Sequence, residues 1–337
     1  MSQQDNDRLK LDLLIRGFQV SRIIRVLADL SLADKIEPHG SLTIEILAAQ
    51  CEVKVQPLLR MLRAAACFDV FSVGPRNEVC HTPLSLLLRT DTPASMCHSA
   101  RFWTTPGSWR AWEYLEVALQ GEVPHVAAWG TTRFEYLKSH PDESRTFAAM
   151  MANFPDSRHE AIATAYDFSS VHQIIDVGGG TGATLKHILS RHAGPKGVTF
   201  DRQDVVSGVD QDALMDGRLS AQAGDFFITV PSGGDVYLMV RVLHDWSDES
   251  AIQILKNCRA AMKPTARLLI CEFVLQQDSK SNVVRELLLD AQMMTMFGDA
   301  HERTELEFAA LLNESGLKLT RVISTSATIS ILEVEPT

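Results

Sequence analysis

The sequence has no long apolar run. Within its 337 residues, no window reaches the roughly 18 apolar residues that a membrane-spanning helix needs. The N-terminal stretch MSQQDNDRLK is polar and charged, and it lacks the apolar segment of a signal peptide. We therefore expect a cytoplasmic protein without a membrane partner.

Paired cysteines are also missing. The chain has no CxxC pair and no His/Cys cluster at zinc-binding spacing. We therefore expect no metal site, and reduced thiols that pack as small hydrophobic groups. The six cysteines are widely spaced: Cys51, Cys67, Cys80, Cys97, Cys258 and Cys271.

An excess of basic residues is absent as well. The formal net charge is -10, and residues 1–91 contain 11 acidic and 11 basic side chains. A nucleic-acid-binding domain needs a basic face, so the balance disfavours a DNA-binding regulator and predicts no nucleic-acid partner.

The first half of the chain, from residue 8 to about 168, has the pattern of a helical region. Apolar residues recur every three and four positions in residues 9–36, as in an amphipathic helix. Residues 41–73 predict two more helices, and FDVFSVGPRNEVCHTP predicts a hairpin around Gly74 and Pro75. This is the outline of a winged helix. The balanced charge and the apolar first helix favour a dimerisation module, and hence a homodimer.

The second half alternates short apolar runs with helix-like stretches. The runs are IIDV, GVTF, DVYLMVRVL and RLLICEFVL. Such alternation predicts an α/β fold, with a parallel sheet covered by helices on both faces.

A glycine-rich turn joins the first of these runs to a helix in HQIIDVGGGTGATLKHIL. Such a turn lies where open α/β sheets bind ligands, because glycine lets the backbone approach a ligand closely. The spacing Gly178-x-Gly180-x-x-Ala183 matches a dinucleotide fingerprint, so a nicotinamide-dependent oxidoreductase is one interpretation.

Acidic residues favour a different ligand. Asp176 precedes the glycines, Asp201 ends the next apolar run, and Asp225 stands beside Phe226. One carboxylate can bind a ribose diol and another an adenine amino group, while a phenyl ring covers the adenine. This set suits a nucleoside that carries a cation, such as S-adenosylmethionine. Taken singly, Asp201 could also cap a strand end, and Asp225 could be a turn residue.

The chain resembles the small-molecule O-methyltransferases that join a class I methyltransferase domain to an N-terminal dimerisation domain. The resemblance covers essentially the whole chain. Its motifs, in the order of the family, are DVGGGTG, FDRQDVV, GDFF, HDWSDE, CEFVL and DAHERTELEF. It implies a Rossmann-like domain, a parallel sheet with one antiparallel strand, beside a mainly helical winged-helix dimerisation domain.

The resemblance also implies a cofactor site for S-adenosylmethionine, with S-adenosylhomocysteine as the product. The candidate cofactor-binding residues are Asp176, Gly178, Gly180, Gly182, Asp201, Asp225, Phe226 and Arg241. Relatives often carry a lysine where this chain has Val240. Arg241, next to it, interrupts an apolar run, so we assign it a cofactor or pocket role; a strand-end cation bound by water is the alternative.

His244 is the candidate general base. It follows the run DVYLMVRVL, at the edge where ligands bind, whereas His39, His125 and His192 fall in polar loops or on helix surfaces. A histidine titrates near pH 6.5 and can accept the proton of a phenol, which titrates near pH 10. The resemblance points to Glu272 and Glu302 as carboxylates that flank it.

The resemblance and the residue types also suggest an apolar substrate pocket. Paired methionines can hold a flat ring, although methionines at helical spacing also fill protein cores. Asp245 can bind the substrate or cap a helix, and Trp103, with Phe102, can form a lid. The candidate substrate-binding residues are Trp103, Met150, Met151, Asn153, Phe154, Asp245, Asp290, Met293 and Met294.

These features predict three segments: a dimerisation domain at 1–100, a helical linker contributing to the pocket at 101–168, and a methyltransferase domain at 169–337. We expect an S-adenosylmethionine-dependent O-methyltransferase that acts on a phenolic or enolic hydroxyl of an aromatic or heteroaromatic secondary metabolite. Some relatives have lost methyl transfer and use the pocket for hydroxylation, decarboxylation or ring-forming chemistry, which remains an alternative.

Overall fold

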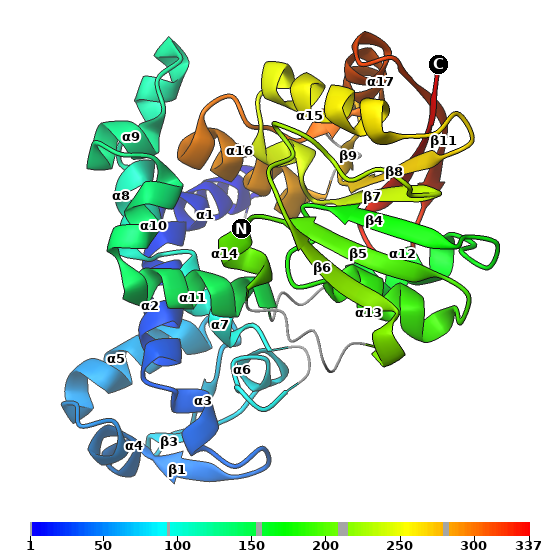
Figure 1. Ribbon diagram of the computed structural model, residues 1–337. Coiled ribbons are helices and arrows are strands. Elements are labelled where there is room, and N and C mark those ends of the chain that lie inside the picture. The colour runs from blue at the N-terminus through cyan, green and yellow to red at the C-terminus, as the bar shows by residue number, and fades with distance from the viewer. Residues whose placement is uncertain (1, 93–94, 153–156, 208–214, 279–282) are drawn as a thin grey trace. The chain divides into compact units, whose positions relative to one another are not determined.

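The computed structural model describes residues 2–92, 95–152, 157–207, 215–278 and 283–337 (Figure 1). The chain forms two compact units. The first comprises residues 1–114 and 125–155, and the second comprises residues 115–124 and 156–337. No helix among the described residues is both long and apolar enough to cross a bilayer.

The first unit is mainly helical, with a small sheet in which β1 and β2 both pair antiparallel with β3. Its strands are β1 (Ser41–Thr43), β2 (Ser72–Val73) and β3 (Glu78–Cys80). Its helices are α1 (Gln3–Ile15), α2 (Gly17–Asp29), α3 (Leu32–Lys35), α4 (Ile44–Gln50), α5 (Val55–Ala66), α6 (Pro83–Leu86), α7 (Cys97–Phe102), α8 (Pro106–Trp112), α9 (Pro124–Trp129), α10 (Arg133–Ser139) and α11 (Pro141–Ala152).

The expected hairpin is confirmed, because β2 and β3 pair across Gly74 and Pro75. The amphipathic stretch at 9–36 forms three helices instead of one. Arg16 lies between α1 and α2 and is not helical. Apolar side chains of α2, α4 and α5, including Leu27, Leu47 and Leu62, meet in one buried core.

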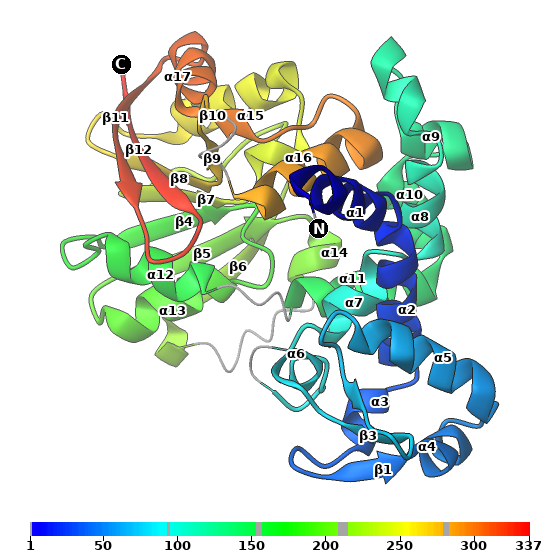
Figure 2. The same ribbon diagram turned by 180° about the vertical axis from the view of Figure 1, so that it is seen from behind.

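The second unit is built on a seven-stranded sheet in the order β11-β12-β8-β7-β4-β5-β6 (Figure 2). Its strands are β4 (Gln173–Val177), β5 (Lys196–Asp201), β6 (Leu219–Ala223), β7 (Val236–Val240), β8 (Arg267–Glu272), β11 (Leu317–Ser324) and β12 (Ser330–Pro336). Five strands pair in parallel, and β12 runs antiparallel to both of its neighbours. The predicted parallel sheet with one antiparallel strand is therefore confirmed.

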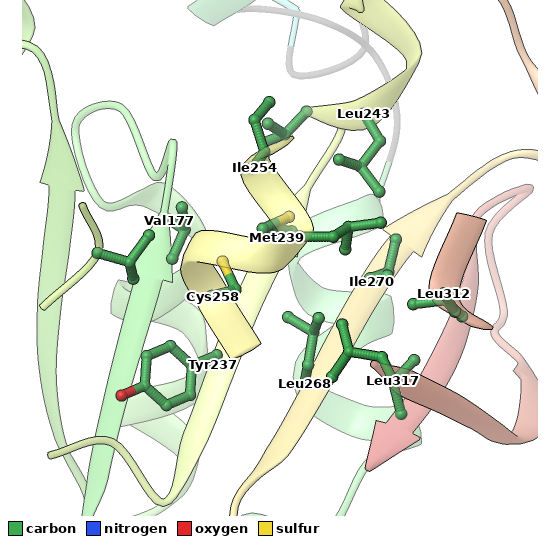
Figure 3. Packing of buried hydrophobic residues seen from close by; sticks show 14 of the residues in the cluster. Val177, Tyr237, Met239, Leu243, Ile254, Cys258, Leu268, Ile270, Leu312 and Leu317 are labelled. Atoms are coloured by element: carbon green, nitrogen blue, oxygen red, sulfur yellow. The ribbon is translucent and has the colours of Figure 1, made fainter. Parts of the chain in front are cut away.

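Helices cover both faces of this sheet. Residues of α15 and α17 pack on one face with Met239 and Ile270 (Figure 3). Residues of α12 and α13 pack on the other face. A two-stranded parallel pair, β9 (Val274–Leu275) and β10 (Arg303–Thr304), lies beside the main sheet. The remaining elements are the 3-10 turns η1 (Leu115–Gln120), η2 (Met215–Gly217) and η3 (Leu243–Asp245), and the helices α12 (Arg158–Ala165), α13 (Ala183–Arg191), α14 (Gln203–Val206), α15 (Asp248–Ala261), α16 (Val284–Phe297) and α17 (Glu305–Glu314).

Candidate active site

The glycine turn connects β4 to α13 at the carboxyl end of the sheet. Gly178, Gly180 and Gly182 all have positive φ, at 72°, 57° and 75°. A Cβ at Gly178 would lie 2.8 Å from Cγ2 of Val242 and 3.7 Å from the Phe226 ring. The lack of a side chain at Gly178 thus lets the glycine turn pack closely against Val242, with the Phe226 ring nearby.

Two carboxylates stand at the same edge. One oxygen of Asp201 accepts the Gly180 N–H at 2.9 Å, which ties the end of β5 to the glycine turn. Asp225 is exposed, and its carboxylate accepts the Phe227 N–H at 2.8 Å. Carboxylates at a glycine turn near an aromatic ring fit a nucleoside that carries a cation, and fit a pyrophosphate poorly because like charges repel.

Asp176 does not belong to this open edge. It is 1% exposed, and its carboxyl group lies beneath the glycine turn, 2.6 Å from where a Cβ of Gly179 would stand. Burial, with a contribution from Asp201, raises the pKa of Asp176 to about 8. The carboxyl group of Asp176 therefore supports the turn from inside, and its contact with the cofactor stays a prediction.

His244 lies in η3, the short turn that follows β7. Its Nδ1 is 3.2 Å from one Glu272 oxygen and 3.4 Å from the other. Its Nε2 is 3.2 Å from Oδ1 of Asp245. Burial and the Arg241 guanidinium lower the pKa of His244, but the carboxylates of Asp245 and Glu272 outweigh them and raise that pKa above its ordinary value.

Glu272 ends β8, the strand next to β7, and is fully buried. One of its oxygens accepts the backbone N–H groups of Val242 and Leu243, each at 2.9 Å. Burial raises the pKa of Glu272, but the charges of His244 and Arg241 outweigh it and hold that pKa well below its usual range. The carboxylate is therefore ionised and fixed in place beside the imidazole.

Arg241 and Glu302 take positions that the sequence did not indicate. Arg241 has φ 56°, and its guanidinium donates to both oxygens of Glu302 and, at 2.8 Å, to Glu272. The Arg241 side chain lies between two buried glutamates, and its expected cofactor or pocket role stays a prediction. Glu302 pairs with Arg241, and Arg241 also pairs with Glu272, the carboxylate that contacts the imidazole.

Arg303 is a site residue that the sequence reasoning missed. Its side chain is fully buried and donates to the carbonyl oxygens of Leu243 and Trp246, both at 2.8 Å. It also donates to Asp248 at 2.9 Å. The sequence offers one indication of it, a basic residue inside the motif DAHERTELEF, but a motif does not show which groups that residue contacts.

A cavity of about 620 Å³ lies beside this network in the second unit, and Ser247, Asp290, Met294 and His301 contribute to its lining. Asp290 also accepts the Glu302 N–H at 2.8 Å, which links the cavity wall to the buried charges. Met293, one residue earlier on α16, is 9% exposed.

The other predicted substrate residues belong to the first unit or lie outside the described residues. Met150 is buried at 2% exposure, whereas Met151 and Trp103 are 49% and 36% exposed. Asn153 and Phe154 lie outside the described residues.

Comparisons with known proteins give a consistent result. Residues 112–318 match the model of the O-methyltransferase domain family. The chain is 36% identical to a phenazine O-methyltransferase of Lysobacter antibioticus, over 96% of this chain and 94% of that protein. It is 34% identical to a 3-amino-4-hydroxybenzoate 4-O-methyltransferase of Streptomyces cremeus, over 92% and 85%.

A solved structure extends the similarity to the whole chain. The methyltransferase CalO1 of calicheamicin biosynthesis, solved with S-adenosylhomocysteine bound, superposes with a TM-score of 0.86 at 28% identity. The superposition covers 100% of both chains.

Proposed function

Because this chain belongs to the O-methyltransferase domain family and is a methyltransferase that uses S-adenosylmethionine, we propose that His244 is the general base for methyl transfer to a hydroxyl group. The acceptor is a phenolic or enolic aromatic or heteroaromatic molecule of secondary metabolism. The observation that carries the proposal is the buried His244–Glu272 contact of 3.2 Å, which lies next to Val242, the residue that packs on Gly178 of the glycine turn.

The glycine turn and the neighbouring carboxylates would hold the methyl donor. Bound S-adenosylmethionine supplies an electrophilic methyl group on a sulfonium and leaves as S-adenosylhomocysteine. Gly178 would line the donor site, Asp201 and Asp225 would present carboxylates to the nucleoside, and Phe226 would pack against it. Gly180 and Gly182 shape the turn through their positive φ angles.

His244 would make the acceptor oxygen nucleophilic. A phenol is largely neutral at pH 7, so its oxygen must lose a proton as the new oxygen–carbon bond forms. That proton goes to Nε2, where the Asp245 carboxylate now lies. The Asp245 side chain is 33% exposed, so an acceptor hydroxyl can take its place. The Glu272 carboxylate at Nδ1 orients the ring and stabilises the imidazolium that forms.

We assign the acceptor pocket to residues of α16 and of the histidine turn. Asp290, Met293 and Met294 would contribute from α16, with Asp245 from the histidine turn. Trp103, Met150, Met151, Asn153 and Phe154 are proposed from the sequence resemblance alone.

We also propose a homodimer formed through a dimerisation domain at 1–100, with a linker at 101–168 and a methyltransferase domain at 169–337. Helix α1 supports it, because none of its residues is buried in the single chain. All six cysteines are free, which fits a reducing cytoplasm. The balanced charge of residues 1–91 supports a protein that binds no nucleic acid.

Calorimetric titration with S-adenosylhomocysteine tests the donor site, with NADH as the control ligand. We expect micromolar binding of the first and none of the second. Wild type and His244→Ala are then incubated with S-adenosylmethionine and a panel of hydroxyphenazines and 3-amino-4-hydroxybenzoate. Methylation by wild type alone supports the base. Equal methylation by the wild type and by His244→Ala would refute the role of His244 as the base. Binding of NADH would indicate an oxidoreductase.

A further inference from the structure

The turn that carries the base has few backbone hydrogen bonds of its own. Within η3 and its flanks, the Asp245 N–H donates to the Val242 carbonyl at 3.3 Å, and the Trp246 N–H to the Leu243 carbonyl at 3.2 Å. Both distances are at the long end for N–H···O bonds, and no side chain caps the turn. A single such turn is marginal in isolation, so other groups must fix the position of His244.

The N–H side of the turn is held by Glu272. Its carboxylate accepts the N–H groups of Val242 and Leu243, the two residues before the histidine. The Leu243 side chain is fully buried in the core next to Met239 and Ile270 (Figure 3). These contacts anchor the start of the turn. An ionised carboxylate only accepts hydrogen bonds, so the carbonyl groups of the turn need a different partner.

The carbonyl side is held by Arg303. One guanidinium nitrogen donates to the Leu243 carbonyl, a second to the Trp246 carbonyl, and Nε donates to Asp248. The acceptors lie before and after His244 and Asp245 in the sequence, so Arg303 holds the chain on both sides of these two residues. The backbone of Arg303 is itself in register with Val274, two residues after Glu272. Glu272 ends β8, whereas Arg303 lies on β10, which pairs with β9, the strand that follows β8 along the chain.

We infer that Arg303 is a positioning residue, which fixes the histidine turn through its backbone carbonyl groups. The inference rests on the proposed role of His244. Only a planar guanidinium presents several donors in a fixed fork; a lysine ammonium is a single point charge and cannot reach both carbonyls in the same geometry. Loss of this fork would leave the turn free to shift relative to Glu272, and a displacement of about 1 Å can reduce a rate by about 100-fold.

The test compares Arg303→Lys with a matched control, Arg259→Lys. Arg259 also donates to two backbone carbonyls of the second unit, those of Gly316 and Thr337. We expect Arg303→Lys to lower kcat by about 10- to 100-fold. We expect the KM for S-adenosylmethionine and the affinity for S-adenosylhomocysteine to change less than about threefold, since the glycine turn is untouched. Arg259→Lys should lower thermal stability and leave kcat unchanged.

A spectroscopic readout separates positioning from a merely structural role. NMR of protein labelled in its histidine rings, with His244→Ala for assignment, gives the pKa of the His244 imidazole. In Arg303→Lys this pKa should fall toward its ordinary value, because the contact with Glu272 loosens. If Arg303→Lys does not fold, Asp248→Asn removes the carboxylate that orients Arg303, and the same changes should follow with smaller size.

Two results would overturn the inference. The first is an Arg303→Lys protein of lower thermal stability with unchanged kcat and His244 pKa. The second is an Asp248→Asn protein that matches wild type in both readouts when Arg303→Lys does not fold. Failure of the proposed base looks different, because His244→Ala would then retain its methylation activity.

Discussion

The Glu272 carboxylate contacts both Nδ1 of His244 and the two backbone N–H groups that precede it in the chain. One buried side chain thus controls the electrostatics of the imidazole and the position of its turn. Because Val240 on β7 is in register with Cys271 on β8, the residues that follow both strands are brought together.

We predict that Glu272→Gln lowers kcat at least about 100-fold, because the imidazolium formed in the reaction loses its carboxylate. The base must be neutral, and the pKa of His244 is raised. The wild-type kcat/KM should therefore fall as the pH decreases through a value above about 6.5. In Glu272→Gln this fall of kcat/KM at acidic pH, the acid limb of the profile, should move to lower pH.

Glu333→Gln is the control for this prediction. Glu333 is a buried glutamate on β12 that accepts from Tyr166 and Arg321, within the same sheet. Its variant should keep the wild-type profile of rate against pH. An unshifted acid limb in Glu272→Gln would show that the limb reports another group.

Gly178→Ala should weaken binding of S-adenosylhomocysteine about tenfold or more, while Gly180→Ala should weaken it less. Both residues have positive φ, so alanine costs about 1–2 kcal/mol of backbone strain at either position. Only at Gly178 does the added Cβ meet another side chain, 2.8 Å from Val242. Calorimetric titration of both variants provides the comparison. Equal losses would mean that the strain, and not the occupied space, sets the affinity.

The resemblance pointed to the His244–Glu272 pair, and the sequence pattern placed both residues at the carboxyl ends of strands, where ligands bind in open α/β sheets. The sequence could not predict where the Arg241 side chain points. That residue has φ 56°, which turns its side chain toward Glu302, and strand alternation assumes an extended backbone. It could not predict Arg303 either, because that side chain binds backbone carbonyls, which every residue has.

The environment of two other groups also depended on tertiary packing. Asp176 stands in a motif typical of ligand binding, yet the turn folds over it and leaves it 1% exposed. His125 was assigned to a polar loop or helix surface, yet it is fully buried in the first unit. Neighbours distant in sequence decide such burial, and local composition does not report them.

We predict that replacing Leu14 and Ile15 together by Glu converts a dimer to a monomer. Six large apolar residues of α1 and the start of α2 are exposed in the single chain, and contiguous apolar patches of this kind mark association sites. They are Leu9, Leu11, Leu13, Leu14, Ile15 and Phe18. Light scattering after size-exclusion chromatography gives the mass, and circular dichroism checks the fold.

Ile228→Glu serves as the control, since Ile228 is 76% exposed in the second unit. Its mass should match wild type. A wild-type monomer at micromolar concentration would refute the dimer outright.

The last prediction concerns stability at acidic pH. Burial, with the Arg133 charge, lowers the pKa of His125 to about 4. The folded state therefore favours the neutral imidazole, whereas the unfolded chain binds a proton near pH 6.5. The stabilisation is complete above pH 6.5 and is lost as the pH falls toward 4, by up to about 1.4 kcal/mol per pH unit.

His125→Phe removes this titration and retains a ring that can pack beside Tyr136, which His125 now meets edge-on at 5.4 Å. Urea unfolding at pH 7.5, 6.5 and 5.5 should show the wild type losing stability relative to the variant at the lowest pH. The exposed His172 offers the matched substitution, His172→Phe. If the stability difference between wild type and His125→Phe stays constant with pH, His125 gains its proton equally well in both states, and its burial does not exclude the charge.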